Sequence, residues 1–162
     1  MDQTVTKDDC CTPSETGDDN YDLIVVGAGS AGFSASITAA EAGKRVALVG
    51  DGTIGGTCVN VGCVPSKAMI RAAEAVHGGA SAARFPGISP CEHAVDWPTV
   101  VKGTADLVAE MRDKKYIALL PAYDNVTYIE EGAARLVEGG VVVGGRVLSA
   151  PRVLVATGSR PH

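Results

Sequence analysis

The sequence predicts an α/β fold, with a parallel sheet, flanking helices and a small β-meander. Its 162 residues suffice for one domain with a hydrophobic core, and 46% of them are hydrophobic. Twenty glycines, against one Trp, four Tyr and two Phe, favour packing from Ala, Val and Leu with many tight turns. A strand, a turn, a helix and a second strand follow one another within about 30 residues. This composition and order exclude collagen-like repeats and wholesale disorder.

The first elements form a βαβ unit. Tyr21–Val26 is a short apolar run of the kind that is buried on both faces of a parallel sheet, and it predicts the first strand. The Ala-rich run Phe33–Ala42 predicts a helix that Gly43 ends. Lys44–Val49 predicts the second strand. The unit is typical of a Rossmann-like domain.

The middle of the chain is predicted to be helical. Thr57–His77 forms a second Ala-rich helical segment, interrupted near its start and ended by Gly78. Residues 78–95 are rich in Gly, Ala, Ser and Pro and predict an irregular connection. Asp96 then caps a helix in which apolar residues recur at helical spacing.

The C-terminal part is predicted to be β-structure. Gly-rich turns separate short strands, which together predict a small β-meander over residues 126–131, 133–138, 141–143 and 146–148. Arg152–Ala156 is another apolar run and predicts one more buried strand.

Negative charge is concentrated at the N-terminus. Residues 1–22 hold seven acidic residues and one basic residue, whereas the remainder has a net charge of +1. A nearly neutral body argues against a nucleic-acid partner, and no apolar run is long enough to span a membrane. The tail also lacks the pattern of a secretory signal or a mitochondrial presequence. We therefore expect residues 1–20 to be a flexible acidic leader, residues 21–162 to be the folded domain, and the protein to be cytoplasmic.

A glycine-rich loop joins the first strand to the first helix. Gly27, Gly29 and Gly32 form a GxGxxG motif, and Ser30 and Ala31 lie within it at the start of the helix. In this context the glycines allow a tight turn, a close approach of a pyrophosphate and close packing of helix and strand. The motif therefore predicts dinucleotide binding. The acid expected to bind the ribose falls at Gly50, with Asp51 one residue later.

Two of the five cysteines are five residues apart. On a regular helix such positions are about 140° apart around the axis, with Cα atoms beyond the ~7 Å limit for a disulfide. A Cys58–Cys63 disulfide therefore needs a distorted helical start, which Gly62 and Pro65 allow. Helix N-terminal N–H groups would lower the pKa of a thiol there. The alternative is a pair of buried structural thiols.

The segment Gly55–Lys67, with the sequence GGTCVNVGCVPSK, resembles the redox-active segment of the flavoprotein pyridine nucleotide-disulphide oxidoreductases. The resemblance covers residues 21–162 and implies that the dinucleotide is FAD. It implies that Cys63 lies against the flavin and that Cys58 attacks the substrate. It also implies FAD contacts from Gly52, Thr57, Lys67, Ala133, Ala156, Thr157 and Gly158.

Residues 68–74 and 111–116 are more similar to the family members that reduce Hg(II) than to those that oxidise dihydrolipoamide. We therefore expect Hg(II), held by Cys58 and Cys63, as the substrate, with a small disulfide as the alternative. A non-catalytic FAD-binding or metal-binding thiol module is the alternative of another class. A second GxGxxG unit for NAD(P)H and a dimerisation domain are absent from the sequence, so we expect an N-terminal part of a longer, homodimeric enzyme. The sequence gives no role to Cys10, Cys11 or Cys91.

Overall fold

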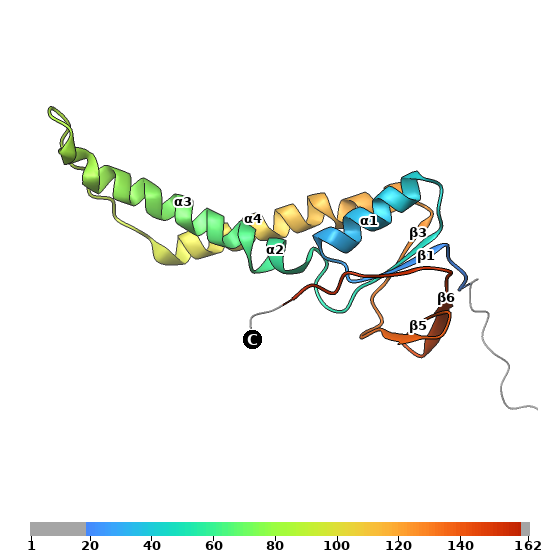
Figure 1. The fold of residues 1–162 in the computed structure, drawn as a ribbon. Coiled ribbons are helices and arrows are strands. Elements are labelled where there is room, and N and C mark those ends of the chain that lie inside the picture. The colour runs from blue at the N-terminus through green and yellow to red at the C-terminus, as the bar shows by residue number, and fades with distance from the viewer. Residues whose placement is uncertain (1–18, 160–162) are drawn as a thin grey trace, which may run out of the picture.

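The computed structural model describes residues 19–159, which contain a four-stranded parallel sheet and a three-stranded antiparallel sheet (Figure 1). The parallel sheet has the order β3-β2-β1-β7. Its strands are β1 (Leu23–Val26), β2 (Val46–Val49), β3 (Val126–Ile129) and β7 (Val153–Val155). Because all neighbours are parallel, the carboxyl ends of the four strands meet at one edge.

Helix α1 (Ser30–Glu41) connects β1 to β2, and a longer helical excursion connects β2 to β3. This excursion comprises α2 (Gly56–Asn60), α3 (Cys63–Ala80), a 3₁₀ turn η1 (Ser81–Arg84), α4 (Trp97–Lys115) and a second 3₁₀ segment η2 (Ile117–Ala122). Figure 1 shows α3 and α4 side by side, as an arm that extends away from the sheet. The redox segment therefore lies at the base of this arm.

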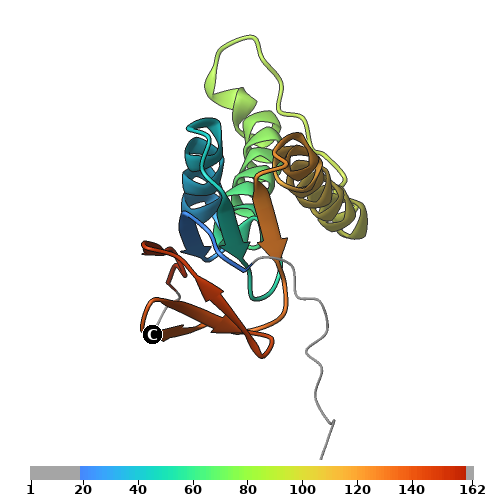
Figure 2. The same ribbon diagram turned by 90° about the vertical axis from the view of Figure 1, so that its right-hand side faces the viewer.

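Alternating side chains of the parallel sheet enter two separate cores. Ile24 packs with Val141 and Leu148 of the antiparallel sheet, whereas its neighbour Val25 packs with Phe33 and Tyr116 on the helical side. This alternation is the period of two expected for a strand covered on both faces. Figure 2 shows the parallel sheet between the helices and the antiparallel sheet. The short apolar runs of the sequence are therefore buried as predicted.

The antiparallel sheet has the order β4-β5-β6, with strands β4 (Arg135–Val137), β5 (Gly140–Val143) and β6 (Arg146–Ser149). Asn20 bridges Ser149, and the Asp19 carboxylate pairs with the Arg146 guanidinium. The folded unit therefore already includes Asp19 and Asn20, two residues that the sequence assigned to the leader. The rest of that leader lies outside the described residues.

The structure confirms the βαβ unit, the break inside the second helical segment, and the cap of α4. The Asp96 carboxylate accepts a hydrogen bond from the Thr99 N–H at 3.3 Å. Two predictions are wrong. Residues 126–129 join the parallel sheet beside β2 instead of the meander, and α3 continues past Gly78 to Ala80. Among residues 19–159, no helix is long and apolar enough to cross a membrane.

Candidate functional site

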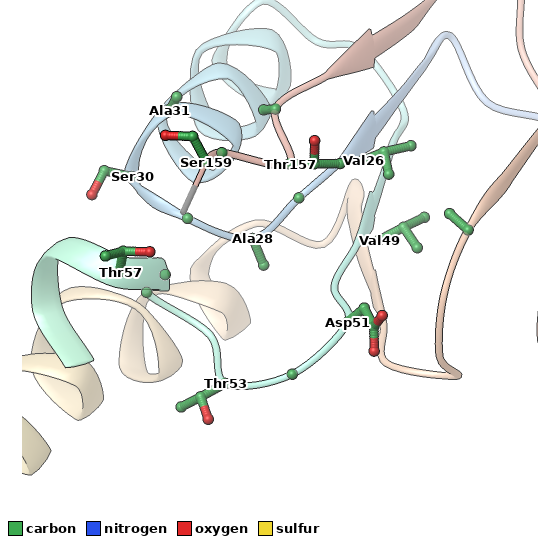
Figure 3. A pocket seen from close by; sticks show the side chains of 18 of the residues that line it. Val26, Ala28, Ser30, Ala31, Val49, Asp51, Thr53, Thr57, Thr157 and Ser159 are labelled. Carbon is green, nitrogen blue, oxygen red and sulfur yellow. The ribbon is translucent and has the colours of Figure 1, made fainter. Parts of the chain in front are cut away.

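A cavity of about 630 Å³ lies at the carboxyl ends of β1, β2 and β7. Figure 3 shows Ser30 and Thr57 at one end of it, Asp51 at the other, and Ala28 between them. Apart from Cys58 and Asp51, the lining residues carry no ionisable side chain. They are Val26, Gly27, Ala28, Gly29, Ser30, Ala31, Val49, Asp51, Gly52, Thr53, Gly55, Gly56, Thr57, Cys58, Gly132, Ala133, Ala134, Ala156, Thr157, Gly158 and Ser159. This position is where open α/β sheets bind ligands.

The three glycines of the GxGxxG motif do different work. A Cβ atom on Gly27, whose φ is +118°, would lie 2.2 Å from the Ala156 carbonyl oxygen, and one on Gly32 would lie 1.8 Å from the Gly27 carbonyl oxygen. The fold itself therefore excludes side chains at both positions. A Cβ atom on Gly29 would meet only the Gly56 Cα at 3.6 Å, an ordinary contact. Gly29 lines the cavity, so its missing side chain leaves room for a ligand rather than for the fold.

The N-terminus of α1 forms part of the cavity wall. Ser30 and Ala31 are its first residues, and the first backbone N–H bonded within this turn is that of Phe33, to the Gly29 carbonyl at 2.9 Å. The N–H groups before it have no carbonyl partner inside the helix and carry its positive dipole end. Since no basic side chain lines the cavity, these N–H groups are its source of attraction for a phosphate.

The two cysteines of the redox segment are brought together by a break between α2 and α3. Helix α2 ends at Asn60 with Val61 as its C-cap, Gly62 takes a non-helical conformation, and Cys63 begins α3. A Cβ atom on Gly62 would lie 2.8 Å from the Thr57 carbonyl oxygen, so the break requires a glycine. The predicted distortion is confirmed, and the described Cys58 and Cys63 are free thiols.

Contact between these thiols changes their chemistry. A hydrogen bond with Cys63, followed by burial and the charge of Cys63, raises the pKa of Cys58 above its ordinary value. The Cys63 backbone N–H lowers the pKa of Cys58, as expected at the start of a helix, but the Cys63 thiol and burial outweigh it. Cys58 is half-buried and lines the cavity, whereas Cys63 is exposed and lies outside the lining.

Asn60 anchors the redox segment, and the sequence analysis missed it. Its side-chain amide donates to the carbonyls of Ile54 at 3.0 Å and Gly56 at 2.9 Å, and its Oδ1 accepts from Arg112 of α4 at 3.2 Å. Asn60, the last residue of α2, is thus bonded to the loop before this helix, to the first residue of the helix and to α4 of the arm. A polar residue between the two cysteines was the available signal, but its partners are apparent only in the fold.

The cavity gathers most of the predicted cofactor residues from four separate segments. Of the predicted set, Gly32, Lys67 and Cys63 do not line it: Gly32 is buried in the packing of α1, and Lys67 is exposed on α3. Sequence reasoning missed Val26, Ala28, Val49, Thr53, Gly55, Gly56, Gly132, Ala134 and Ser159. Most of these are neighbours of predicted residues in the same loops, so the loops were identified correctly.

In the described part of the chain, no group of three or more His, Cys, Asp or Glu side chains is arranged to hold a metal ion. Cys91 is exposed, in the connection between η1 and α4. Cys10 and Cys11 lie outside the described residues. A soft metal that enters the cavity would meet the Cys58 thiol, whereas the Cys63 thiol lies outside the lining.

Comparison with known proteins agrees with this geometry. Residues 21–162 match the family model of the pyridine nucleotide-disulphide oxidoreductases. The chain is 44% identical over 147 residues to a mercuric reductase of Streptomyces lividans and 43% identical over 145 residues to one of Lysinibacillus sphaericus. These matches cover 87% and 89% of the chain but only 31% and 26% of the relatives.

The fold has solved counterparts. An HOCl-induced flavoprotein disulfide reductase from Escherichia coli superposes with a TM-score of 0.71 at 24% identity, over 88% of this chain and 29% of that one. Its Cu(II) complex gives a TM-score of 0.69 at 23% identity, over 86% of this chain and 28% of that one. At this identity the likeness establishes the fold alone.

Proposed function

Because the chain belongs to the pyridine nucleotide-disulphide oxidoreductase family, we propose that its cavity holds FAD and that Cys58 and Cys63 form a redox-active dithiol beside it. Gly29 carries this proposal. Its side chain is absent although the fold leaves room for one, and it lies on the cavity wall at the N-terminus of α1. A pyrophosphate is the group that needs such an approach.

The lining residues fit the rest of a dinucleotide. Gly27, Gly29, Ser30 and Ala31 would face the pyrophosphate, while Gly32 keeps α1 close to β1. Asp51 and Gly52 would face the adenosine ribose. The remaining parts of the dinucleotide would contact the backbone of the other predicted lining residues, which are Thr57, Ala133, Ala156, Thr157 and Gly158. Lys67, on the exposed start of α3, would reach the flavin ring from outside this cavity.

When bound, the flavin supplies a two-electron carrier between a nicotinamide and the dithiol. The Cys58–Cys63 disulfide takes up two electrons and two protons to become two thiols. Cys58 would then attack the substrate, and Cys63 would be the thiol on the flavin side. Because Cys63 lies outside the cavity lining, at the start of α3, this role requires the flavin ring to extend beyond the cavity toward that helix. Both thiols lie at the break between α2 and α3, where the neighbouring Cys63 raises the pKa of Cys58.

For the whole protein we propose reduction of Hg(II) to Hg(0) with electrons from NAD(P)H. The similarity to mercuric reductases supports this substrate, as does the preference of soft thiolates for soft metals. The chain spans 31% or less of these relatives, so we assign nicotinamide binding and homodimer formation to the whole protein. We assign FAD binding to residues 21–162 and the reaction to the cytoplasm, where thiols stay reduced.

The first test is flavin binding by the chain itself. FAD is added to the purified chain, free flavin is removed by gel filtration, and bound flavin is read from its absorbance and fluorescence. We expect about one FAD per chain. A chain that retains no flavin but still binds Hg(II) through its thiols would instead be a metal-binding thiol module.

The second test separates the substrates. The whole protein is assayed with NADPH and Hg(II), and separately with NAD⁺ and dihydrolipoamide. We expect release of Hg(0), lost on Cys58→Ala, and little oxidation of dihydrolipoamide. Vigorous dihydrolipoamide oxidation without Hg(0) would identify a dihydrolipoyl dehydrogenase and leave the FAD and dithiol assignments in place.

A further inference from the structure

Gly50 stands where a dinucleotide-binding domain of this type has its ribose-binding acid, at the end of β2. Gly50 is buried, and its φ lies outside the left-handed region, so its backbone alone would accept any residue. A Cβ atom there would lie 2.7 Å from the Tyr128 hydroxyl oxygen, 2.9 Å from its ring and 3.2 Å from the Ala28 Cβ. The space that an acid needs is therefore filled by Tyr128.

Tyr128 is fixed in this place by the sheet. It pairs in register with Leu48, two residues before Gly50, and packs against the helical core. Its hydroxyl oxygen is buried. Burial, followed by the charge of Glu130, raises the pKa of Tyr128, so the ring stays neutral. The ring thus fills the space beside Gly50.

Asp51 is the next residue along the chain. The Gly50 N–H donates to the Ile129 carbonyl at 2.9 Å, which extends the β2–β3 ladder by one residue. The chain leaves the sheet after this bond, and Asp51 is exposed on the cavity wall. Its carboxylate is the one acidic side chain among the lining residues, whereas Glu130 and Glu131 lie outside the lining.

We propose that the Gly50–Tyr128 contact moves ribose recognition from residue 50 to Asp51. Asp51 accepts hydrogen bonds from the ribose hydroxyls of the adenosine half, and Tyr128 is the positioning residue that keeps residue 50 free of a side chain. This inference rests on the proposed function, because it assumes that the cavity binds an adenine dinucleotide.

The test compares ADP with 2′-deoxy-ADP as competitors of FAD on the purified chain. We expect the parent chain to prefer ADP, and Asp51→Asn to lower that preference about tenfold, as expected for loss of a hydrogen bond to a charged group. Asp113→Asn, an exposed acid on α4, is the matched control and should leave the preference unchanged. An unchanged preference in Asp51→Asn would overturn the assignment. Failure of both nucleotides and FAD to bind the parent chain would instead contradict the proposed function.

The role of Tyr128 is tested by placing an acidic side chain at position 50 in a variant that lacks the Asp51 carboxylate. In the Asp51→Asn background, Gly50→Glu together with Tyr128→Val should restore the preference for ADP, whereas Gly50→Glu with Tyr128 retained should not. Equal restoration with and without Tyr128 would show that Tyr128 positions nothing. A folding readout checks the same contact: Gly50→Ala should lower the melting temperature less in the Tyr128→Val background than in the parent. Equal losses in the two backgrounds would overturn the role of Tyr128.

Discussion

The Ser30 hydroxyl oxygen lies 3.0 Å from the Tyr116 hydroxyl oxygen, which joins the first residue of α1 to the C-cap residue of α4. Ser30 lines the cavity, and Tyr116 is 8% exposed, with its ring edge-on to Phe33 at 4.8 Å. The helical arm is thus connected directly to the dinucleotide loop. When Tyr116 donates to Ser30, the Ser30 hydroxyl proton is left to face the cavity.

Removal of the Tyr116 hydroxyl should affect the site more than the fold. Tyr116→Phe keeps the ring contact with Phe33 and removes one hydrogen bond, so we expect a stability loss of about 0.5–1.5 kcal/mol in urea unfolding. FAD affinity should fall no further in the double variant than in Ser30→Ala alone, because Tyr116 acts on the cavity through the Ser30 hydroxyl. Additive losses would show that the two hydroxyls act separately.

The glycines of the loop should divide into folding and binding positions. Gly32→Ala places a Cβ atom against the Gly27 carbonyl and should prevent folding, read as loss of the cooperative thermal transition. Gly29→Ala meets no such obstacle, so it should fold normally and bind FAD more weakly. Gly29→Val should block binding altogether. Full flavin retention in Gly29→Val would contradict the pyrophosphate assignment.

Alkylation of the reduced chain should depend on bound FAD. Without FAD, Cys63 should react faster with iodoacetamide than Cys58, because Cys63 is exposed whereas Cys58 is half-buried. With FAD, the order should reverse, because the proposed role places Cys63 behind the flavin. Mass spectrometry after limited labelling measures both rates. The same order in both states would remove the proposed division of roles.

The pH dependence of alkylation should report the contact between the thiols. The neighbouring Cys63 and burial raise the pKa of Cys58, so its thiolate forms only at higher pH than in a free cysteine. The rate of Cys58 alkylation should therefore keep rising at pH values above the pKa of a free cysteine. Cys63→Ala should move the profile to lower pH, and Cys91→Ala should leave it unchanged.

Asn60 should control the dithiol, and Asn125 offers a matched control. The Asn125 amide also donates to two backbone carbonyls, those of Ala40 and Lys44, at the opposite end of the sheet. Each Asn→Ala change removes two such bonds, and Asn60→Ala also removes the bond from Arg112, so we expect each change to cost about 1–3 kcal/mol of stability. Only Asn60→Ala should also shift the thiol–disulfide equilibrium of Cys58 and Cys63, measured against glutathione. A shift of equal size in Asn125→Ala would make the effect one of general stability.

Local features of the chain were predictable from the sequence because they depend on neighbouring residues. The order of strand, glycine loop and helix around Gly29 follows from short-range periodicity, as does the cap at Asp96. The break at Gly62 was predictable for the same reason, since the spacing of the two cysteines is incompatible with one regular helix.

Pairing across long stretches of chain was decided only by the tertiary structure. Residues 126–129 have the pattern of any short strand, and their place beside β2 depends on the whole excursion through α2, α3 and α4. Lys67 lies outside the cavity because α3, which has no buried residue, leaves the sheet as part of the arm.

The sequence by itself determined the dinucleotide loop, the cysteine pair and the α/β class, because each is encoded within about 30 consecutive residues. Only the tertiary structure decided which side chain stands beside Gly50. The contact with Tyr128 joins two strands that are adjacent in the sheet but distant in the sequence, and no local pattern encodes such a neighbour. The sequence has Gly50 where an acid was expected, and in the fold Tyr128 fills the space that the side chain of such an acid would need.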